Sequence, residues 1–252
     1  MNATSLPSRT PWPARIGWAC LNALQALFTM LVTMAGFPVA LLLGLLFGPR
    51  LPLRMAAWYW APLLFLGAGV RLRVEGAGRV DWSRPQVLVA NHASMIDICA
   101  LFRAVPVPLR FVLKHEMSSV PVVGWYAKAM GMVFIDRGNA RDAKRRLGDA
   151  AEQLRGAATF AAFPEGTRSK DGSVGPFKAG ILQLAIEAGV PVVPVAIEGA
   201  GRVLPPSGFS VRPGEIVLRF GDPIETTGMA PQDRNALARR AREAVVALLH
   251  AR

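Results

Sequence analysis

The stretch QVLVANHASMID, residues 86–97, decides the fold of this 252-residue chain. After Gln86, the residues VLVA form a short apolar run that is typical of a buried strand. Polar residues follow at once, and Ser94 with Asp97 three positions later matches the S-x-x-D pattern that caps a helix. A buried strand that leads through a short loop into a helix is the repeating unit of an α/β fold. This unit places the loop residues, His92 among them, at the carboxyl end of a strand.

The same alternation continues along the chain from residue 71. The strands that we predict are short and rich in Val, Ile, Leu and Phe, at residues 71–75, 86–90, 110–114, 132–136, 159–163, 192–197 and 215–220. We predict helices at residues 139–155, with Asn139 as the cap, and at 177–188 and 233–250. The pattern indicates an α/β fold with a mostly parallel sheet flanked by helices. Ligands of such folds bind at the carboxyl ends of the strands.

The N-terminal quarter of the chain has a different composition. No charged side chain occurs between residues 16 and 48, and a second apolar block covers residues 55–70. The first run exceeds both the 7–15-residue core of a secretory signal and the ~20 residues that one spanning helix needs. We therefore divide the chain into an N-terminal membrane-anchoring helical region, residues 1–70, and an α/β domain, residues 71–252.

The flanks of the first apolar run predict how it meets the membrane. Basic residues stand on both sides of the run (Arg9, Arg15, Arg50 and Arg54), and Gly36-Phe37-Pro38 interrupts it. Basic flanks prefer the cytoplasmic side of a membrane, and proline disfavours the continuation of a helix. We predict a bent hairpin that breaks at Gly36-Phe37-Pro38 and dips into one leaflet. A single spanning helix and a buried helix of a soluble protein are the alternatives.

The net charge of +12 limits the choice of partners. Strong basicity suits nucleic acid, an anionic membrane surface or a phosphorylated substrate. Because the chain carries no recognised nucleic-acid motif, we expect membrane lipids as partners and no nucleic acid. Cys20 and Cys99 form no C-x-x-C pair, and His115 and His250 have no useful spacing to His92. We therefore expect no metal site.

His92 and Asp97 allow two interpretations. An imidazole can take a proton near neutral pH, and a carboxylate in the first turn of the following helix can hold its tautomer, as in a catalytic triad. The alternative is that Asp97 only completes the helix cap begun by Ser94. Ser94 itself lacks the glycines of a G-x-S-x-G nucleophile elbow. A hydroxyl group of the substrate would then be the group that His92 activates.

Three further segments contain or follow predicted strands. GMVFIDRG, residues 131–138, ends in Asp136 and Arg137, and Arg137 is either a phosphate ligand or the partner of Asp136 in a surface ion pair. In FPEGTRSKDG, residues 163–172, Glu165 and Arg168 flank a Gly-Thr turn. This turn either presents backbone N–H groups to a ligand or is simply solvated, and it lacks the spacing of a phosphate-binding Walker loop. VPVVPV, residues 190–195, is apolar and predicts a buried strand.

Together the four segments resemble the motifs of the glycerolipid acyltransferases, the family of 1-acyl-glycerol-3-phosphate acyltransferases. NHASMID resembles the NHx4D motif of that family, GMVFIDR its second motif, FPEGTRS its third and VPVVPV its fourth. The motifs stand in the expected order, and the resemblance covers roughly residues 70–225.

The resemblance implies acyl transfer from acyl-CoA or acyl carrier protein to the sn-2 hydroxyl of 1-acyl-glycerol-3-phosphate, which gives phosphatidic acid. It implies His92 as the general base and Asp97 as its partner. The residues that it implies for binding the phosphate-bearing acceptor are Lys114, Arg137, Glu165, Gly166, Thr167 and Arg168. The fourth motif receives no role beyond a wall at the entrance for the acyl chain.

The resemblance also bears on cofactors and location. It implies no cofactor besides the acyl-donor substrate, and a bacterial inner membrane with the catalytic domain on the cytoplasmic face. Two alternatives stay open. One is the same chemistry on another lysolipid, such as a lyso-ornithine lipid, and the other is a membrane lipid-binding protein without catalysis.

Overall fold

The computed structural model describes residues 12–135, 140–156 and 158–251. Within these residues, seven strands form one sheet in the order β1-β7-β6-β2-β5-β3-β4. Their bounds are β1 Val70–Glu75, β2 Val87–Ala90, β3 Leu109–Lys114, β4 Val133–Ile135, β5 Thr159–Ala162, β6 Val192–Glu198 and β7 Gly214–Phe220. The sequence predicted each of them, and each described end lies within one residue of its prediction.

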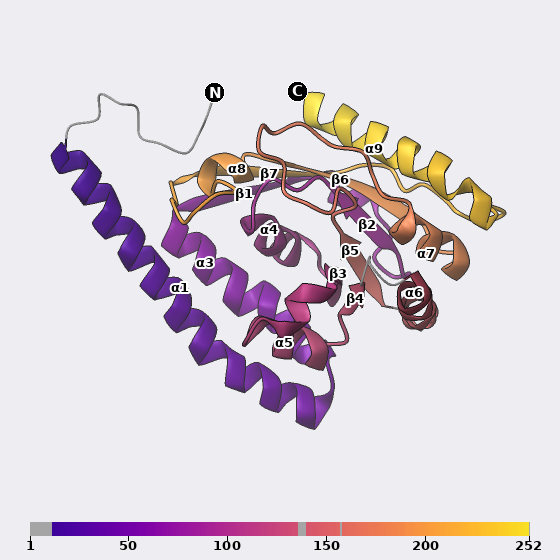
Figure 1. Cartoon of the computed structure of the whole chain (residues 1–252), viewed down its shortest axis with the longest axis horizontal. Helices are drawn as coiled ribbons and strands as arrows, with labels where there is room; N and C mark the ends of the chain where they lie inside the picture. The colour runs from indigo at the N-terminus through magenta and orange to yellow at the C-terminus, as the bar shows by residue number, and fades with distance from the viewer. Residues whose placement is uncertain (1–11, 136–139, 157, 252) are drawn as a thin grey trace.

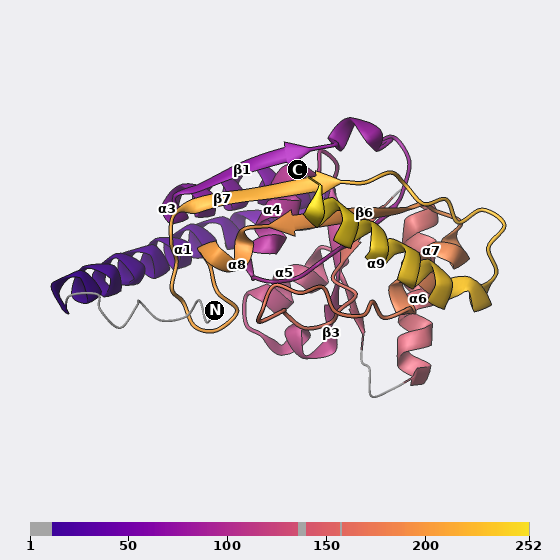
Figure 2. The ribbon, with the colours of Figure 1, turned by 90° about the horizontal axis from the view of Figure 1, so that it is seen from above.

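The sheet is mostly parallel, as predicted. Neighbouring strands pair in parallel except β6 and β7, which are antiparallel. β1 and β7 therefore run opposite to the other strands, and Figure 2 shows them side by side at one side of the sheet. The carboxyl ends of β6, β2, β5, β3 and β4 consequently meet at one edge.

Helices cover both faces of the sheet (Figure 1). Helices α3 (Ala61–Ala68) and α4 (Ile96–Ala104) lie on one face, and α6 (Ala140–Arg155), α7 (Gly180–Ala188) and α9 (Arg234–His250) lie on the other. Every residue of β2 is buried: Leu88 and Ala90 join the core under α3 and α4, and Val87 and Val89 join the core under α6, α7 and α9. A strand covered on both faces reads as a continuous apolar run, which explains residues 86–90.

The other elements are short. They are η2 (Ala77–Arg79), η3 (His115–Ser119), α5 (Val123–Ala129), α8 (Ala200–Val203) and η4 (Pro231–Asp233). The helix predicted at 233–250 is confirmed as α9, and that at 177–188 is α7, which begins only at Gly180 because the backbone N–H of Lys178 donates to Pro164. The predicted helix at 139–155 is α6, and its proposed cap Asn139 lies outside the described residues.

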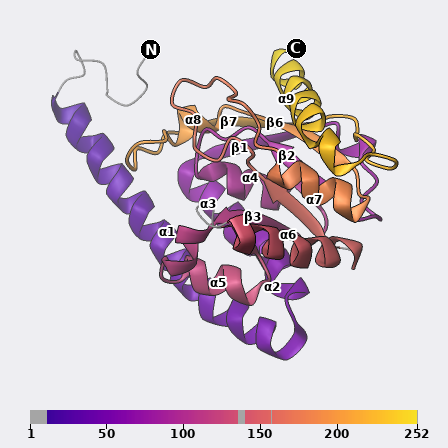
Figure 3. The same cartoon turned by 45° about the vertical axis from the view of Figure 1, so that its right-hand side comes forward.

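The predicted break in the N-terminal apolar run is wrong. Helix α1 is continuous from Trp12 to Phe47 with Pro38 inside it, which is about 54 Å at 1.5 Å per residue. A proline removes one backbone hydrogen bond, and the packing of the surrounding turns offsets this cost. The chain turns instead at Gly48, which has φ of +77°. Helix α2 (Arg50–Met55), the π-helical turn η1 (Ala56–Trp60) and α3 then run back along α1 (Figures 1 and 3).

Small residues and side-chain hydrogen bonds hold α1 against the returning helices. Gly36 lies against the ring of Tyr59, whose hydroxyl donates to the carbonyl of Val32 at 3.1 Å. The indole N–H of Trp60 donates to Thr33 Oγ1 at 3.0 Å. Glycine at such contacts lets two helices approach closely. Because α2, η1 and α3 also contribute Leu53, Ala56, Ala61, Phe65 and Ala68 to the core, they connect α1 to the sheet domain. The division at residues 70 and 71 stays a prediction.

The outer face of α1 is apolar and exposed. It carries Leu24, Leu27, Leu31, Met34, Leu42, Leu45, Leu46 and Phe47. Among the described helices, α1 is the one long and apolar enough to cross a membrane. An exposed apolar face of this extent is typical of a lipid contact, and it does not fit the alternative of a buried helix in a soluble protein. Helix α1 is therefore a candidate membrane segment.

The Gly36 contact leads to a stability prediction. A Cβ atom at position 36 would lie 2.6 Å from Tyr59 Cε1, and the hydroxyl bond of Tyr59 restrains the ring from moving away. We expect Gly36→Ala to destabilise the protein by about 1–3 kcal/mol through overpacking. Gly17→Ala, on the same helix with open space around it, should stabilise it by up to about 1 kcal/mol. Thermal unfolding of the purified, detergent-solubilised variants measures both, and equal shifts would contradict this packing.

Candidate active site

The loops that carry the first and third motifs follow neighbouring strands. β2 pairs with β5, with Val89 opposite Ala162, and β5 pairs with β3, with Ala161 opposite Phe111. The loop after β2 and the loop after β5 therefore leave the same edge of the sheet side by side. This is the edge where parallel α/β sheets bind ligands.

His92 and Asp97 are in contact at this edge. His92 Nδ1 lies 2.8 Å from Asp97 Oδ2, and the Asp97 side chain is buried. The same oxygen accepts the backbone N–H groups of Ala93 at 2.9 Å and Ser94 at 2.8 Å. The predicted cap is present only in part: Asp97 accepts the N–H of Ser94, whereas Ser94 Oγ accepts the N–H of Ile96 at 3.3 Å and the residue directly before α4 is Met95. One carboxylate oxygen thus both caps the loop before α4 and holds the imidazole.

This geometry suits proton transfer. When Nδ1 carries the hydrogen that Asp97 accepts, Nε2 is left as a proton acceptor. The ring is also fixed in its plane, because it stacks on Phe163 with centroids 3.9 Å apart and an interplanar angle of 13°. No role for Phe163 was predicted from the sequence. The sequence feature that could have indicated this contact is an aromatic residue directly after β5, the strand that pairs with β2.

Glu165 holds the backbone of His92. Its Oε1 accepts the N–H of His92 at 2.8 Å and its Oε2 accepts the N–H of Gly175 at 2.8 Å. The N–H of Ser169 donates to the carbonyl of His92 at 2.7 Å. Burial raises the pKa of Glu165, and the N–H groups of Gly175 and His92 partly oppose this rise. Both oxygens of Glu165 are directed at protein backbone, so its predicted contact with the acceptor lipid stays a prediction.

Asn91 joins the site to the neighbouring strand β6. Its amide donates to the carbonyl of Ile197 at 2.9 Å and accepts the N–H of Ile197 at 2.8 Å. This pair of bonds fixes the residue before His92 relative to β6, a role that the sequence analysis missed. Residues 192–195 of the fourth motif form the start of β6, as predicted. The side chains of residues 190–195 are all buried. The predicted part of this motif in acyl entry is untested.

The remaining predicted site residues lie around the same edge. Gly166 has φ of +78°, which favours glycine at this turn, and Thr167 and Arg168 after it are exposed. Among the described residues, Arg168 has no hydrogen bond or ion pair. Lys114 is exposed at the end of β3, opposite Ile135 of β4. Arg137, like Asp136, lies outside the described residues, so its position relative to His92 stays a prediction.

No metal-binding cluster of three or more His, Cys, Asp or Glu residues occurs among the described residues. Cys99, two residues after Asp97, is buried, and burial raises the pKa of its thiol to about 12. A thiol of this kind is a poor metal ligand because the thiolate is the binding form.

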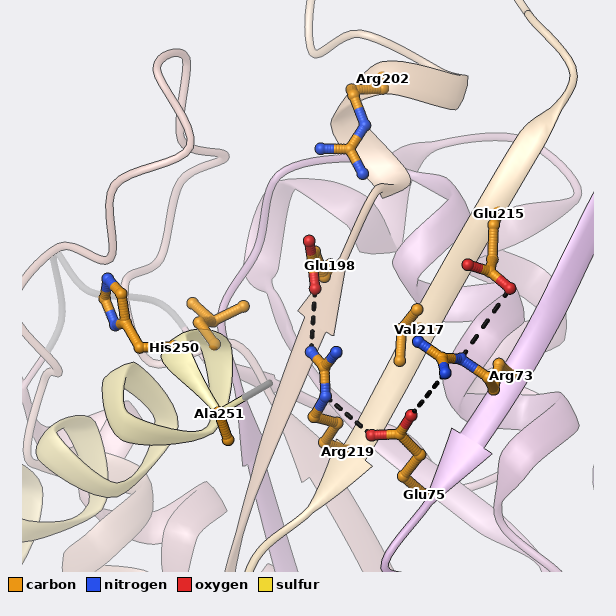
Figure 4. Close-up of a pocket in the computed structure, with 10 residues that line it drawn as sticks. Arg73, Glu75, Glu198, Arg202, Glu215, Val217, Arg219, His250 and Ala251 are labelled. Atoms are coloured by element: carbon orange, nitrogen blue, oxygen red, sulfur yellow. Dashed lines mark hydrogen bonds and ion pairs between the residues drawn. The ribbon is translucent and has the colours of Figure 1, made fainter.

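A polar pocket elsewhere on the molecule is a separate feature (Figure 4). It lies on β1, β6 and β7 beside the end of α9, and its lining includes none of the predicted site residues. Arg219 donates to Glu75 at 2.8 Å and to Glu198 at 2.9 Å, and Arg73 pairs with Glu75 at 3.2 Å. The arginine–glutamate pairs satisfy one another, as expected for a solvated sheet face.

Comparison with known families agrees with this site. A family model described as Acyltransferase matches residues 71–198, half of the chain. The chain belongs to the Acyltransferase family. This assignment matches the resemblance found in the four sequence motifs, all of which lie within the matched residues.

Named relatives of this acyltransferase-family chain point the same way. A chloroplastic 1-acyl-sn-glycerol-3-phosphate acyltransferase of Brassica napus is 38% identical over 138 residues, which are 55% of this chain and 38% of that protein. The human 1-acyl-sn-glycerol-3-phosphate acyltransferase alpha is 32% identical over 179 residues, 71% of this chain and 63% of that protein. The chain thus spans less than two thirds of the length of these relatives.

A solved structure extends the likeness to the N-terminal helices. The crystal structure of PlsC, the 1-acyl-sn-glycerophosphate (LPA) acyltransferase of Thermotoga maritima, superposes with a TM-score of 0.74 at 28% sequence identity. The match covers 93% of this acyltransferase-family chain and 98% of the Thermotoga chain. The mixed sheet with flanking helices is therefore a fold that this family already contains.

The His92–Asp97 contact predicts how two substitutions lower activity. We expect His92→Ala to reduce acyl transfer about 10²–10⁴-fold by loss of the base. The protein should still fold, because Asp97 Oδ2 keeps the backbone N–H groups of Ala93 and Ser94. Asp97→Asn keeps an oxygen for the N–H groups of Ala93 and Ser94, yet removes the negative charge facing the imidazole. It should therefore lose much of the rate at small cost in stability. An active His92→Ala enzyme would disprove the role of the base.

Proposed function

We propose that this protein transfers a fatty acyl group from a thioester donor, acyl-CoA or acyl carrier protein, to the sn-2 hydroxyl of 1-acyl-glycerol-3-phosphate. The product is phosphatidic acid, a precursor of phospholipids. The observation that carries the proposal is the buried Asp97 carboxylate 2.8 Å from the imidazole of His92. The family membership and the names of the human, Brassica and Thermotoga proteins support the choice of substrate.

His92 acts as general base and then as general acid in this proposal. Its Nε2 takes the proton of the acceptor hydroxyl while that oxygen attacks the thioester carbonyl carbon. The carbon–sulfur bond breaks, and the imidazolium gives the proton to the departing thiolate. Asp97 stabilises the imidazolium between the two steps. The stacked ring of Phe163 and the two backbone bonds of His92 keep Nε2 in one place throughout.

The acceptor phosphate is proposed to bind the basic residues at the same edge. Arg168 is exposed there, and its guanidinium has no partner among the described residues. An arginine binds a phosphate group through two charge-assisted hydrogen bonds. Lys114 lies at the end of β3, two strands from β2 in the sheet. We assign these two cations, together with Arg137, to the phosphate and not to the acyl donor.

The test is acyl transfer from labelled acyl-CoA to a panel of lysolipids presented in mixed micelles. We expect 1-acyl-glycerol-3-phosphate to be the preferred acceptor over a lyso-ornithine lipid and over lysolipids without a terminal phosphate. A preferred lyso-ornithine acceptor would reject the proposed substrate and keep the chemistry. Absence of transfer to every acceptor, from both acyl-CoA and acyl carrier protein, would favour a lipid-binding protein without catalysis.

The same assay tests the phosphate site. Arg168→Ala should raise the KM for the phosphorylated acceptor about tenfold or more, as loss of a charge-assisted contact predicts, and leave the KM for acyl-CoA unchanged. Arg168→Lys should recover only part of the loss. Arg155→Ala is the control, because Arg155 is exposed at the end of α6 and, within the described part of the chain, donates only to the carbonyl of Glu187. Equal effects of Arg168→Ala on both substrates would show that Arg168 supports the loop.

We further propose that α1 lies within one leaflet of the inner membrane, with the catalytic domain on the cytoplasmic face. Its inner side is held to the domain along Gln25, Val32, Gly36 and Ala40, which are buried. If α1 crossed the hydrocarbon core, the parts of α3 and η1 that pack against α1 would have to lie in that core as well. A helix lying along the surface instead places its outer apolar face in lipid and keeps the site beside the acceptor.

Cysteine labelling tests this topology. Arg15→Cys and Arg50→Cys, each in a Cys20→Ala background, place single reactive thiols near the two ends of the anchor. Cys99 is buried and stays unreactive. We expect a membrane-impermeant maleimide to spare both positions in intact cells and to modify both in inside-out vesicles. Modification of only one position in intact cells would show that α1 spans the bilayer.

A further inference from the structure

Helix α9 contacts the loop of the third motif through one arginine. Arg242 Nε donates to the carbonyl oxygens of Val174 at 3.2 Å and Gly175 at 2.9 Å, and Arg242 Nη2 donates to Val174 at 2.6 Å. Arg242 lies outside residues 71–198, the part that the family model matches. The sequence predicts residues 233–250 only as one of the helices that flank the sheet.

One of the two residues that Arg242 contacts, Gly175, is connected to the catalytic base through Glu165. Gly175, whose carbonyl accepts from Arg242, donates its own N–H to Glu165 Oε2 at 2.8 Å. Glu165 Oε1 accepts the N–H of His92 at 2.8 Å. Gly175 and Glu165 are also closely packed, since a Cβ atom at position 175 would lie 3.2 Å from Glu165 Oε2. A continuous series of hydrogen bonds therefore joins the guanidinium of Arg242 to the backbone of His92.

We propose that Arg242 is a positioning residue for the reaction. It fixes the peptide groups of Val174 and Gly175, which keeps the Glu165 carboxylate against the N–H of His92 and so sets the place of the imidazole. The inference rests on the proposed function for its kinetic consequences. The structural part of the inference, the coupling of residue 242 to the His92 segment, does not depend on which substrate the protein uses.

The loop needs such an external contact. Residues 163–179 connect β5 to α7 without helix or strand, and their internal bonds, such as that of Gly175 to Glu165, join parts of the loop only to one another. Asp171 stabilises only the turn at its tip, where the hydroxyl and backbone N–H of Ser173 and the hydroxyl of Ser169 lower its pKa to about 2. The section that contains Gly175 is held by α9.

An arginine is well suited to this contact. The guanidinium is planar and permanently charged, and it offers several N–H donors in a fixed arrangement. It can therefore serve two successive carbonyl groups at once, and hydrogen bonds from a charged donor are about twice as strong as neutral ones. A lysine ammonium on a flexible stem can occupy the same space but holds the two carbonyls less firmly.

Hydrogen–deuterium exchange of the full-length protein tests the coupling without an activity assay. Arg242→Met keeps the aliphatic stem and removes the donors. We expect it to increase exchange in the peptide of residues 170–178 and also in that of residues 89–97, which contains the N–H of His92. Arg234→Met is the matched control on the same helix, since Arg234 donates to Gln183 Oε1 of α7. It should change neither peptide.

Kinetics separate positioning from a general loss of structure. Arg242→Met should lower kcat about 10- to 100-fold, the effect expected when a catalytic group shifts by a fraction of an ångström to 1 Å, while both KM values and the thermal unfolding temperature change little. Arg242→Lys should recover part of kcat. Gly175→Ala tests the same series of hydrogen bonds at Glu165, because the added Cβ atom would crowd the Glu165 carboxylate. This variant should also lower kcat more than it raises KM.

Two results would overturn the inference. In one, Arg242→Met raises exchange in residues 170–178 alone and leaves kcat at the wild-type value, so that the arginine supports the loop and nothing more. In the other, Arg242→Met and Arg234→Met have equal effects. A wild-type protein that fails to acylate 1-acyl-glycerol-3-phosphate, yet shows the exchange coupling between residue 242 and residues 89–97, would reject the proposed function and support the link.

Discussion

The carboxylate of Asp97 is buried at the start of α4, and the conformation of the active-site loop depends on it. A carboxylate removed from water is costly unless N–H donors replace the lost water. Asp97 Oδ2 has three such partners within six residues of chain, the imidazole of His92 and the backbone N–H groups of Ala93 and Ser94. The loop is therefore shaped by the need to satisfy one oxygen, and the orientation of the imidazole is a result of that shape.

The position of the loop in turn depends on the sheet. β2 lies between β5 and β6, so the neighbours of its carboxyl end are fixed by strand order. Asn91 bonds to Ile197 of β6 on one side, and His92 bonds to Glu165 and Ser169 beyond β5 on the other. Asn91 and His92 are therefore held from opposite sides by residues that are far apart in the sequence. These bonds explain how His92 can have a fixed position although it lies in a loop.

Features with a local cause could be predicted from the sequence, whereas those with a distant cause could not. The central strands β2, β5 and β6 were predictable because continuous apolar runs follow from burial on both faces. The contact of His92 with Asp97 was suggested by their spacing at a helix start. The continuity of α1 through Pro38 was missed because Tyr59 and Trp60, more than twenty residues away, stabilise that turn. The roles of Phe163, Glu165 and Arg242 depend on contacts between segments that are far apart in the sequence, which a single sequence does not reveal.

The order of strands has a consequence for how the molecule is made. β1 pairs with β7, Val70 opposite Gly214, and in the described sheet it has no other neighbour. Since a chain is synthesised from its N-terminus at roughly 5–20 residues per second, the first strand waits several seconds for its only partner. Helix α1 is complete long before that moment and can reach lipid while the sheet is still open. A nascent chain with this strand order can therefore contact a membrane through α1 before its sheet, and the His92 loop at the edge of that sheet, is complete.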